Sequence, residues 1–225
     1  MKRYFYIFLI IFMFITCVVG ATYAYFSRLT ESGNDIGVSS YNSSVSMNIN
    51  PVYNDFSLIP MDNEDIFKAI NNKCKDKEDR GACNLYNINI NGYDESIEYI
   101  SGTINTKLDN IVNLSYMVFE EVDYDITNND NCLEVDDIKY CVGKEATLIT
   151  SEEVMSLGNN YDLRGYDNKN LLLAIWLSNL DTNQNSFDIG NYTSEVTIFF
   201  GDEITRVSGS ISSTLKDNYS LQGGE

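Results

Sequence analysis

Apolar and polar residues alternate with a period of two along most of the chain. The alternation is clear in residues 44–50, where Val45, Met47 and Ile49 are separated by polar residues. The same pattern runs through residues 86–91, 96–108, 112–118, 171–177 and 195–201. Because successive side chains of a strand point to opposite faces, this period predicts half-buried β-strands. Polar turn sequences such as Asn-Gly between these segments predict the connections.

Helical patterns are few and short. Asp62 and Asp65 form a start like a capping box for a helix over residues 63–72. Thr150 and Glu153 form a second start, for a helix that ends at the next glycine, Gly158. Each helix is too short to be stable alone, so we expect both to decorate a sheet. Six to nine strands with one or two short helices on loops predict an all-β fold, an antiparallel sandwich of the jelly-roll or immunoglobulin-like kind.

The apolar run of LLLAIWLSN contains the chain's single tryptophan, Trp176. A side chain of this size in such a run is expected deep in the core. We therefore predict a structural role for Trp176.

The first 24 residues resemble an export signal. Lys2 and Arg3 precede residues 4–19, which are apolar apart from one threonine. This charge and length fit the first two parts of a signal peptide. The apolar stretch can also be extended far enough to cross a bilayer, which leaves an uncleaved membrane anchor as the alternative.

The cleavage site is predicted from small side chains that fit a signal peptidase. Thr22 and Ala24 supply them for a cut before Tyr25, and Val19 with Ala21 offers a second register. The mature protein is then secreted or held at the cell surface. Signal peptidase is its first expected partner.

Four segments follow from this organisation. Residues 1–24 are the signal peptide, 25–43 an N-terminal arm, 44–206 the sandwich domain and 207–225 a flexible tail. The tail is assigned because it is polar and offers little to pack. No repeat or Pro-rich linker divides the sandwich.

The chain is strongly acidic, with a net charge of −18. After cleavage, 13 Lys and Arg would remain against 33 Asp and Glu, which gives −20. Such a charge repels nucleic acid and anionic lipid, so we expect neither as a partner, and contact with membrane only through the leader. The surface is otherwise a solvated coat that could gather cations.

Four cysteines remain in the mature chain, in two pairs with the same spacing. Eight residues separate Cys74 from Cys83, and eight separate Cys132 from Cys141. An even number of cysteines in an exported protein predicts disulfides. Three connectivities are possible, of which the local one only requires each loop to fold back on itself. A zinc site with four thiolates is the alternative, although such sites usually place two residues between paired cysteines.

The chain contains no histidine. Zinc hydrolases with an HExxH motif, Ser-His-Asp triads and Cys-His pairs all require imidazole, so these catalytic classes are excluded. A carboxylate pair that cleaves glycosides remains formally open, since 33 acidic residues place some within reach of each other. We predict that the protein is not an enzyme and has no cofactor.

One loop has the composition of a calcium site. Asp181, Asn183, Asn185 and Asp188 place oxygen ligands at close intervals. The loop lacks the glycine and the final glutamate of an EF-hand. A plain hydrophilic turn is the alternative.

Several segments resemble the TasA/camelysin group of exported proteins from Gram-positive-type bacteria. They are the leader end GATYAYFS, the strand pair EYISGTINTKLDNIVNLSYMVFEE, LLLAIWLSNLDTNQN and YTSEVTIFFG. The resemblance implies a jelly-roll-like sandwich, a dedicated signal peptidase and assembly into fibres of the biofilm matrix. The protease activity described for camelysin does not transfer, because no histidine is present to hold zinc. The two cysteine pairs are a departure from the best-known fibre formers.

Fibre assembly has a physical route in the sequence. The arm from Tyr25 to about residue 50 could complete the sheet of a neighbouring subunit, and such a head-to-tail contact propagates into a homopolymer. The alternative is that the same strand pairs within its own sandwich. A rival function is a monomeric adhesin or glycan-binding module that uses the loops after Gly92 and around Asp181, with Tyr161 and Tyr166 stacked on sugar rings.

Overall fold

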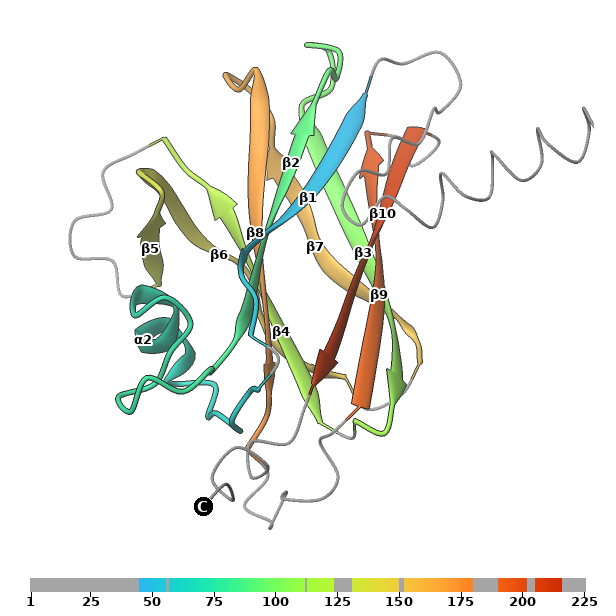
Figure 1. Ribbon diagram of the computed structural model, residues 1–225. Coiled ribbons are helices and arrows are strands. Elements are labelled where there is room, and N and C mark those ends of the chain that lie inside the picture. The colour runs from blue at the N-terminus through green and yellow to red at the C-terminus, as the bar shows by residue number, and fades with distance from the viewer. Residues whose placement is uncertain are drawn as a thin grey trace, which may run out of the picture. The chain divides into compact units, whose positions relative to one another are not determined.

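Ten β-strands and one short helix make up the part of the chain that the structure, a computed structural model, describes (Figure 1). That part comprises residues 45–55, 57–111, 113–123, 131–149, 152–179, 190–201 and 205–215. The strands are β1 (Ser46–Tyr53), β2 (Asn84–Asn91), β3 (Tyr99–Asp109), β4 (Leu114–Glu121), β5 (Cys132–Val135), β6 (Ile138–Ile149), β7 (Val154–Asp162), β8 (Asn168–Leu177), β9 (Gly190–Phe200) and β10 (Thr205–Leu215), and the helix is α2 (Ile66–Asn71).

The strands form two antiparallel sheets that face each other. One has six strands in the order β1-β2-β8-β4-β6-β5, and the other has four in the order β10-β9-β3-β7. Every strand pair within them is antiparallel. The predicted all-β antiparallel sandwich is therefore confirmed.

Strand β8 shows why its sequence is apolar at successive positions. Leu171, Leu173 and their alternate neighbours point into the core between the two sheets. Leu172 and Trp176 point the other way, into a second cluster that α2 and the β5–β6 hairpin cover. Because both faces of β8 are buried, no position in this run favours a polar side chain. Trp176 is fully buried, as predicted, but in this second cluster and not between the sheets.

Tyrosine hydroxyls connect the two sheets across the core. The Tyr86 hydroxyl of β2 lies 3.0 Å from that of Tyr192 in β9, and the Asn84 amide donates to the Tyr192 oxygen at 3.0 Å. Farther along, the Tyr116 hydroxyl donates to the main-chain oxygen of Ser156 at 2.7 Å. Burial raises the pKa of both Tyr86 and Tyr192, so the hydroxyls stay neutral and keep their hydrogen bonds.

The first predicted helix is present and shorter than expected. α2 covers six of the ten predicted residues, with Asp65 at its N-cap. The predicted capping box does not form, because the Asp65 side chain makes no cap hydrogen bond and instead accepts one from Lys68 at 2.7 Å. Packing of Ile66 and Ile70 on the six-stranded sheet holds the helix in place.

The second predicted helix is wrong. Residues 154–158 belong to β7, which continues to Asp162. The spacing of Val154 and Leu157 suggested a helix because the pairing of β7 with β3 shifts register near Gly158, which has a φ of +129°. The shift interrupts the alternation of the strand, and a single glycine tolerates the required backbone. Val154 is in fact 67% exposed.

The predicted flexible tail is also wrong for residues 207–215, which form most of β10. Val207, Ile211 and Leu215 point inward and are buried. The inward positions between them hold Gly209 and Ser213, so the hydrophobic alternation is weak in the sequence. The sandwich therefore extends to Leu215, and residues 216–225 lie outside the described part.

Within the described ranges, no helix is long and apolar enough to cross a membrane.

Candidate functional site

Each sheet has two edge strands, and three of the four carry features that hinder pairing with another chain. β1 contains Pro51 and a register shift, and β7 pairs with β3 through two register shifts. β5 has only four residues and is joined to β6 by the Cys132–Cys141 disulfide. The part of β6 that β5 leaves uncovered carries Lys144 and Glu145. Proline, bulges, short strands and charges are the usual protections of a sheet edge.

The fourth edge, β10, has none of these protections from its third residue, Val207, onward. It pairs with β9 at eleven consecutive positions, without a register shift. Its single charged residue is Arg206, at the second position, and it contains no proline. Its outward side chains after Arg206 are small and uncharged: Ser208, Ser210, Ser212 and Thr214. A long and regular edge of this kind is a template for an added strand.

The first strand of the described chain lies beside this edge. Strands β1 and β10 lie close to each other (Figure 1). Met47 and Ile49 of β1 approach β10 at Gly209, where an added Cβ would lie 2.9 Å from the Ile49 Cδ1. Glycine therefore permits the close approach of β1 and β10.

The sheet surface next to the β10 edge is electrically neutral. Strands β3, β9 and β10 together carry two cations, Lys107 and Arg206, and two carboxylates, Asp109 and Glu195. The whole chain has a net charge of −18. Two copies of so acidic a protein repel each other least where their contacting surfaces carry no net charge.

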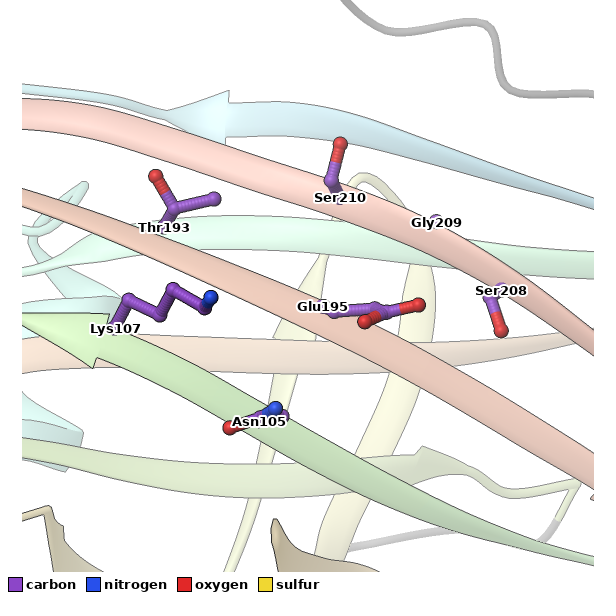
Figure 2. A pocket seen from close by; sticks show the side chains of 7 residues that line it. All are labelled: Asn105, Lys107, Thr193, Glu195, Ser208, Gly209 and Ser210. Atoms are coloured by element: carbon purple, nitrogen blue, oxygen red, sulfur yellow. The ribbon is translucent and has the colours of Figure 1, made fainter. Parts of the chain in front are cut away.

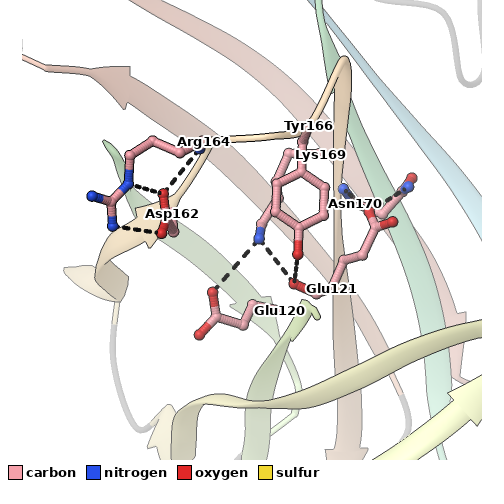
Figure 3. A network of polar contacts seen from close by, with 7 residues as sticks. All are labelled: Glu120, Glu121, Asp162, Arg164, Tyr166, Lys169 and Asn170. Atoms are coloured by element: carbon pink, nitrogen blue, oxygen red, sulfur yellow. Dashed lines mark hydrogen bonds and ion pairs between the residues drawn. The ribbon is translucent and has the colours of Figure 1, made fainter. Parts of the chain in front are cut away.

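A second polar site lies at the other side of the fold, around the buried ammonium of Lys169 (Figure 3). The Lys169 Nζ donates to the main-chain oxygen of Glu121 at 2.9 Å and lies 3.8 Å from a carboxylate oxygen of Glu120. It also lies 4.0 Å from the centre of the Tyr166 ring. The Glu121 carboxylate accepts hydrogen bonds from the main-chain N–H and the side chain of Asn170, at 2.9 and 2.8 Å. These contacts tie the end of β4 to the start of β8.

The electrostatics of this lysine cluster follow from burial. Burial lowers the pKa of Lys169, which the carboxylates of Glu120 and Glu121 oppose. Burial likewise raises the pKa of Glu120 and raises that of Tyr166 to about 12. Every polar side chain of the cluster has a partner, so its arrangement suits a structural tie between strands.

Nearby, an exposed ion pair closes the turn between β7 and β8. Arg164 donates to both carboxylate oxygens of Asp162, at 2.9 and 2.8 Å, and this pairing lowers the Asp162 pKa to about 2 (Figure 3).

Both predicted local disulfides are present, Cys74–Cys83 and Cys132–Cys141, so the zinc alternative is excluded. The first lies beneath α2 in the second cluster, and the second crosslinks the β5–β6 hairpin. Disulfides persist in oxidising compartments, and the two bonds agree with a location outside the cytoplasm.

The structure bears on the other predicted residues unequally. Residues 46–50 pair with β2 of the same chain, so this part of the predicted donor arm is not available to a neighbouring subunit. Tyr161 is 2% exposed, and its ring cannot stack on a sugar. Three groups of predicted residues lie outside the described part. They are the peptidase residues Thr22, Ala24 and Tyr25, the rest of the arm, and the candidate calcium ligands within residues 180–189. Among the described residues, no three acidic or cysteine side chains form a metal-binding group.

Sequence reasoning missed the β10 edge and the buried lysine. The β10 strand was missed because its inward and outward residues differ little in hydrophobicity. The sequence could have indicated that Lys169 is buried, because in a strand it lies on the same face as Leu171 and Leu173, whose side chains face the core. An ionisable residue in register with a buried face requires partners.

No protein family and no curated protein matches the chain. Similar solved structures include a FixG-related protein from Vibrio parahaemolyticus, with 9% identity over 76% of this chain and 96% of that chain and a TM-score of 0.28. AvmM, titled as catalysing macrocyclization in alchivemycin A biosynthesis, has 8% identity over 81% and 97% of the two chains and a TM-score of 0.35. The CooA pilin subunit of enterotoxigenic Escherichia coli has 10% identity over 63% and 86% and a TM-score of 0.27. These low scores carry no conclusion about function.

Proposed function

We propose that this protein is an exported structural subunit that assembles into fibres at the cell surface or in the extracellular matrix. Each subunit accepts a strand from its neighbour along the β10 edge, and the donor is the neighbour's N-terminal arm, residues 25–43. The observation that carries the proposal is the β10 edge, which is long and regular and which from Val207 onward has no proline, bulge or charge, unlike the other edges of the described sandwich.

Three further observations support this proposal. The β10 edge borders a neutral surface on a chain of net charge −18, so repulsion between subunits is lowest there. Two disulfides suit the oxidising exterior to which a cleaved leader would deliver the chain. The resemblance of the leader and of several strands to the TasA/camelysin group points to the same role. The function is thus structural, with no catalysis and no cofactor.

Assembly is tested with the mature chain, residues 25–225, imaged by negative-stain electron microscopy over a concentration series. A variant Ser212→Lys places an ammonium on the outward side of the β10 edge and should abolish filaments while circular dichroism stays unchanged. The matched control is Val154→Lys on β7, the opposite edge of the same sheet, which should polymerise normally.

The donor is tested separately. Deletion of residues 25–42 should leave a folded monomer, and a synthetic peptide of these residues should bind that monomer but not its Ser212→Lys variant. Filaments from either altered protein would contradict the proposal. A wild-type chain that stays monomeric at every concentration would favour the surface-receptor alternative.

A further inference from the structure

The outer face of the four-stranded sheet is exposed, whereas that of the six-stranded sheet is partly covered. In β9 and β10, buried residues alternate with exposed or half-buried ones along the whole strand. The six-stranded sheet buries part of its outer face beneath α2 and the β5–β6 hairpin, while the outward asparagines of β1 and β2 stay exposed or half-buried. One broad sheet face therefore remains in contact with solvent.

This face contains a shallow hollow of about 310 Å³. It is lined by Asn105 and Lys107 of β3, Thr193 and Glu195 of β9, and Ser208, Gly209 and Ser210 of β10 (Figure 2). The volume lies at the lower end of the range for small-molecule sites.

The strand register arranges the polar groups of the hollow in rows. Asn105 pairs with Glu195, and Glu195 pairs with Ser210, so an amide, a carboxylate and a hydroxyl stand side by side across three strands. Neighbouring strands are about 4.8 Å apart. Lys107 and Thr193 form the start of the next row. A ligand on this face meets hydrogen-bond donors and acceptors at regular intervals.

Several of these groups have unused hydrogen-bonding capacity. Among the described residues, no hydrogen bond or ion pair engages the side chains of Thr193, Glu195 or Ser210. The Asn105 Oδ1 is covered and accepts no hydrogen bond from any described residue.

The charge of the protein selects the ligand class. An anionic polymer is repelled by a net charge of −18, whereas an uncharged polymer is not. The hollow lacks aromatic side chains, and its exposed surface is mostly apolar between the polar groups, so it offers a ligand contacts with C–H groups as well as hydrogen bonds. We propose that the hollow binds a sugar unit of an uncharged polysaccharide. Glu195 accepts hydrogen bonds from sugar hydroxyls, and the Asn105 amide N–H groups donate to them. The Lys107 ammonium, which lies 3.2 Å from a carboxylate oxygen of Glu152, donates as well.

A single shallow site of this kind binds weakly. The proposed fibre would repeat the site along its length, and a long polysaccharide that engages many copies gains affinity through effective concentration. Only this gain rests on the proposed function, since the hollow belongs to one subunit.

Affinity electrophoresis of the mature protein through gels that contain dextran, laminarin or galactomannan tests the site, with alginate as the anionic comparison. The Ser212→Lys variant is used as the background, so that binding is measured on a monomer and does not depend on assembly. We expect retardation by at least one neutral polymer and none by alginate. Glu195→Gln and Asn105→Ala should each weaken that binding at least tenfold, while the control Glu134→Gln, an exposed acid on β5, leaves it unchanged.

Three results would overturn the inference. In the first, none of the three neutral polymers retards the protein. In the second, the Glu195→Gln and Asn105→Ala variants are retarded as strongly as their background. In the third, alginate retards the protein as strongly as the neutral polymers do. Loss of filaments in Glu195→Gln on the wild-type background, with glycan binding unchanged, would assign this face to contact between subunits instead.

Discussion

Replacement of Lys169 by methionine isolates the contribution of the buried ammonium. The side chain is 1% exposed, and methionine has a similar length but no charge. The change removes the hydrogen bond to the Glu121 main-chain oxygen, the contact with the Tyr166 ring and the countercharge of Glu120.

The expected cost follows from what is left behind. Removal of one partner of a buried ion pair destabilises a protein by about 3–5 kcal/mol. The Glu120 side chain keeps 30% of its surface exposed, so water screens the remaining carboxylate. We therefore expect Lys169→Met to lower the free energy of unfolding by about 2–3 kcal/mol at pH 8.

The same reasoning predicts a pH dependence of known sign. Burial raises the pKa of Glu120 above its ordinary value, and Lys169 opposes that rise. Without the lysine the pKa rises further. A carboxyl with a raised folded-state pKa destabilises the fold when ionised, and this penalty disappears as the pH falls through that pKa. The deficit of Lys169→Met should therefore be smaller at pH 5 than at pH 8.

Urea unfolding followed by fluorescence measures this deficit, because Trp176 is the single tryptophan and is fully buried. The double variant Lys169→Met/Glu120→Gln should recover part of the loss, since it removes the carboxylate left without a countercharge. The control Lys107→Met removes an exposed lysine and should change stability little. A deficit below about 1 kcal/mol, or an equal deficit at pH 5 and pH 8, would refute the reasoning.

Two further predictions concern packing and the disulfides. Gly143→Ala should destabilise the fold by about 1–3 kcal/mol in urea unfolding, because its Cβ would lie 2.4 Å from a ring carbon of the buried Tyr161. Gly102→Ala, whose added Cβ would lie 3.1 Å from its nearest neighbours, should destabilise the fold less. The reverse order of the two losses would contradict this packing. Replacement of Cys74 and Cys83 by serine should lower stability by about 2–3 kcal/mol, measured the same way, and an unchanged unfolding midpoint would show that the bridge contributes nothing.

The strands with strong alternation were predictable, and the failures have physical causes. β2 and β9 were predicted because one face of each strand is apolar and the other polar. β7 was mistaken for a helix because a register shift at Gly158 breaks its alternation. The β10 sequence predicts a flexible tail because glycine and serine occupy two of its inward positions. β1 pairs with β2 of its own chain. The sequence alone could not decide between this pairing and addition of the strand to a neighbouring subunit.

The amino-acid sequence by itself determined the class of the fold and the exclusion of imidazole chemistry, and it favoured the local disulfides, because each depends on residue type and on spacing along the chain. The tertiary structure alone decided which strand became an unprotected edge, which residues of β3, β9 and β10 line one hollow, and that Lys169 is buried beside Glu120. These properties arise from contacts between residues far apart in sequence, and alternation specifies only which face of a strand is buried, not which strand lies beside it.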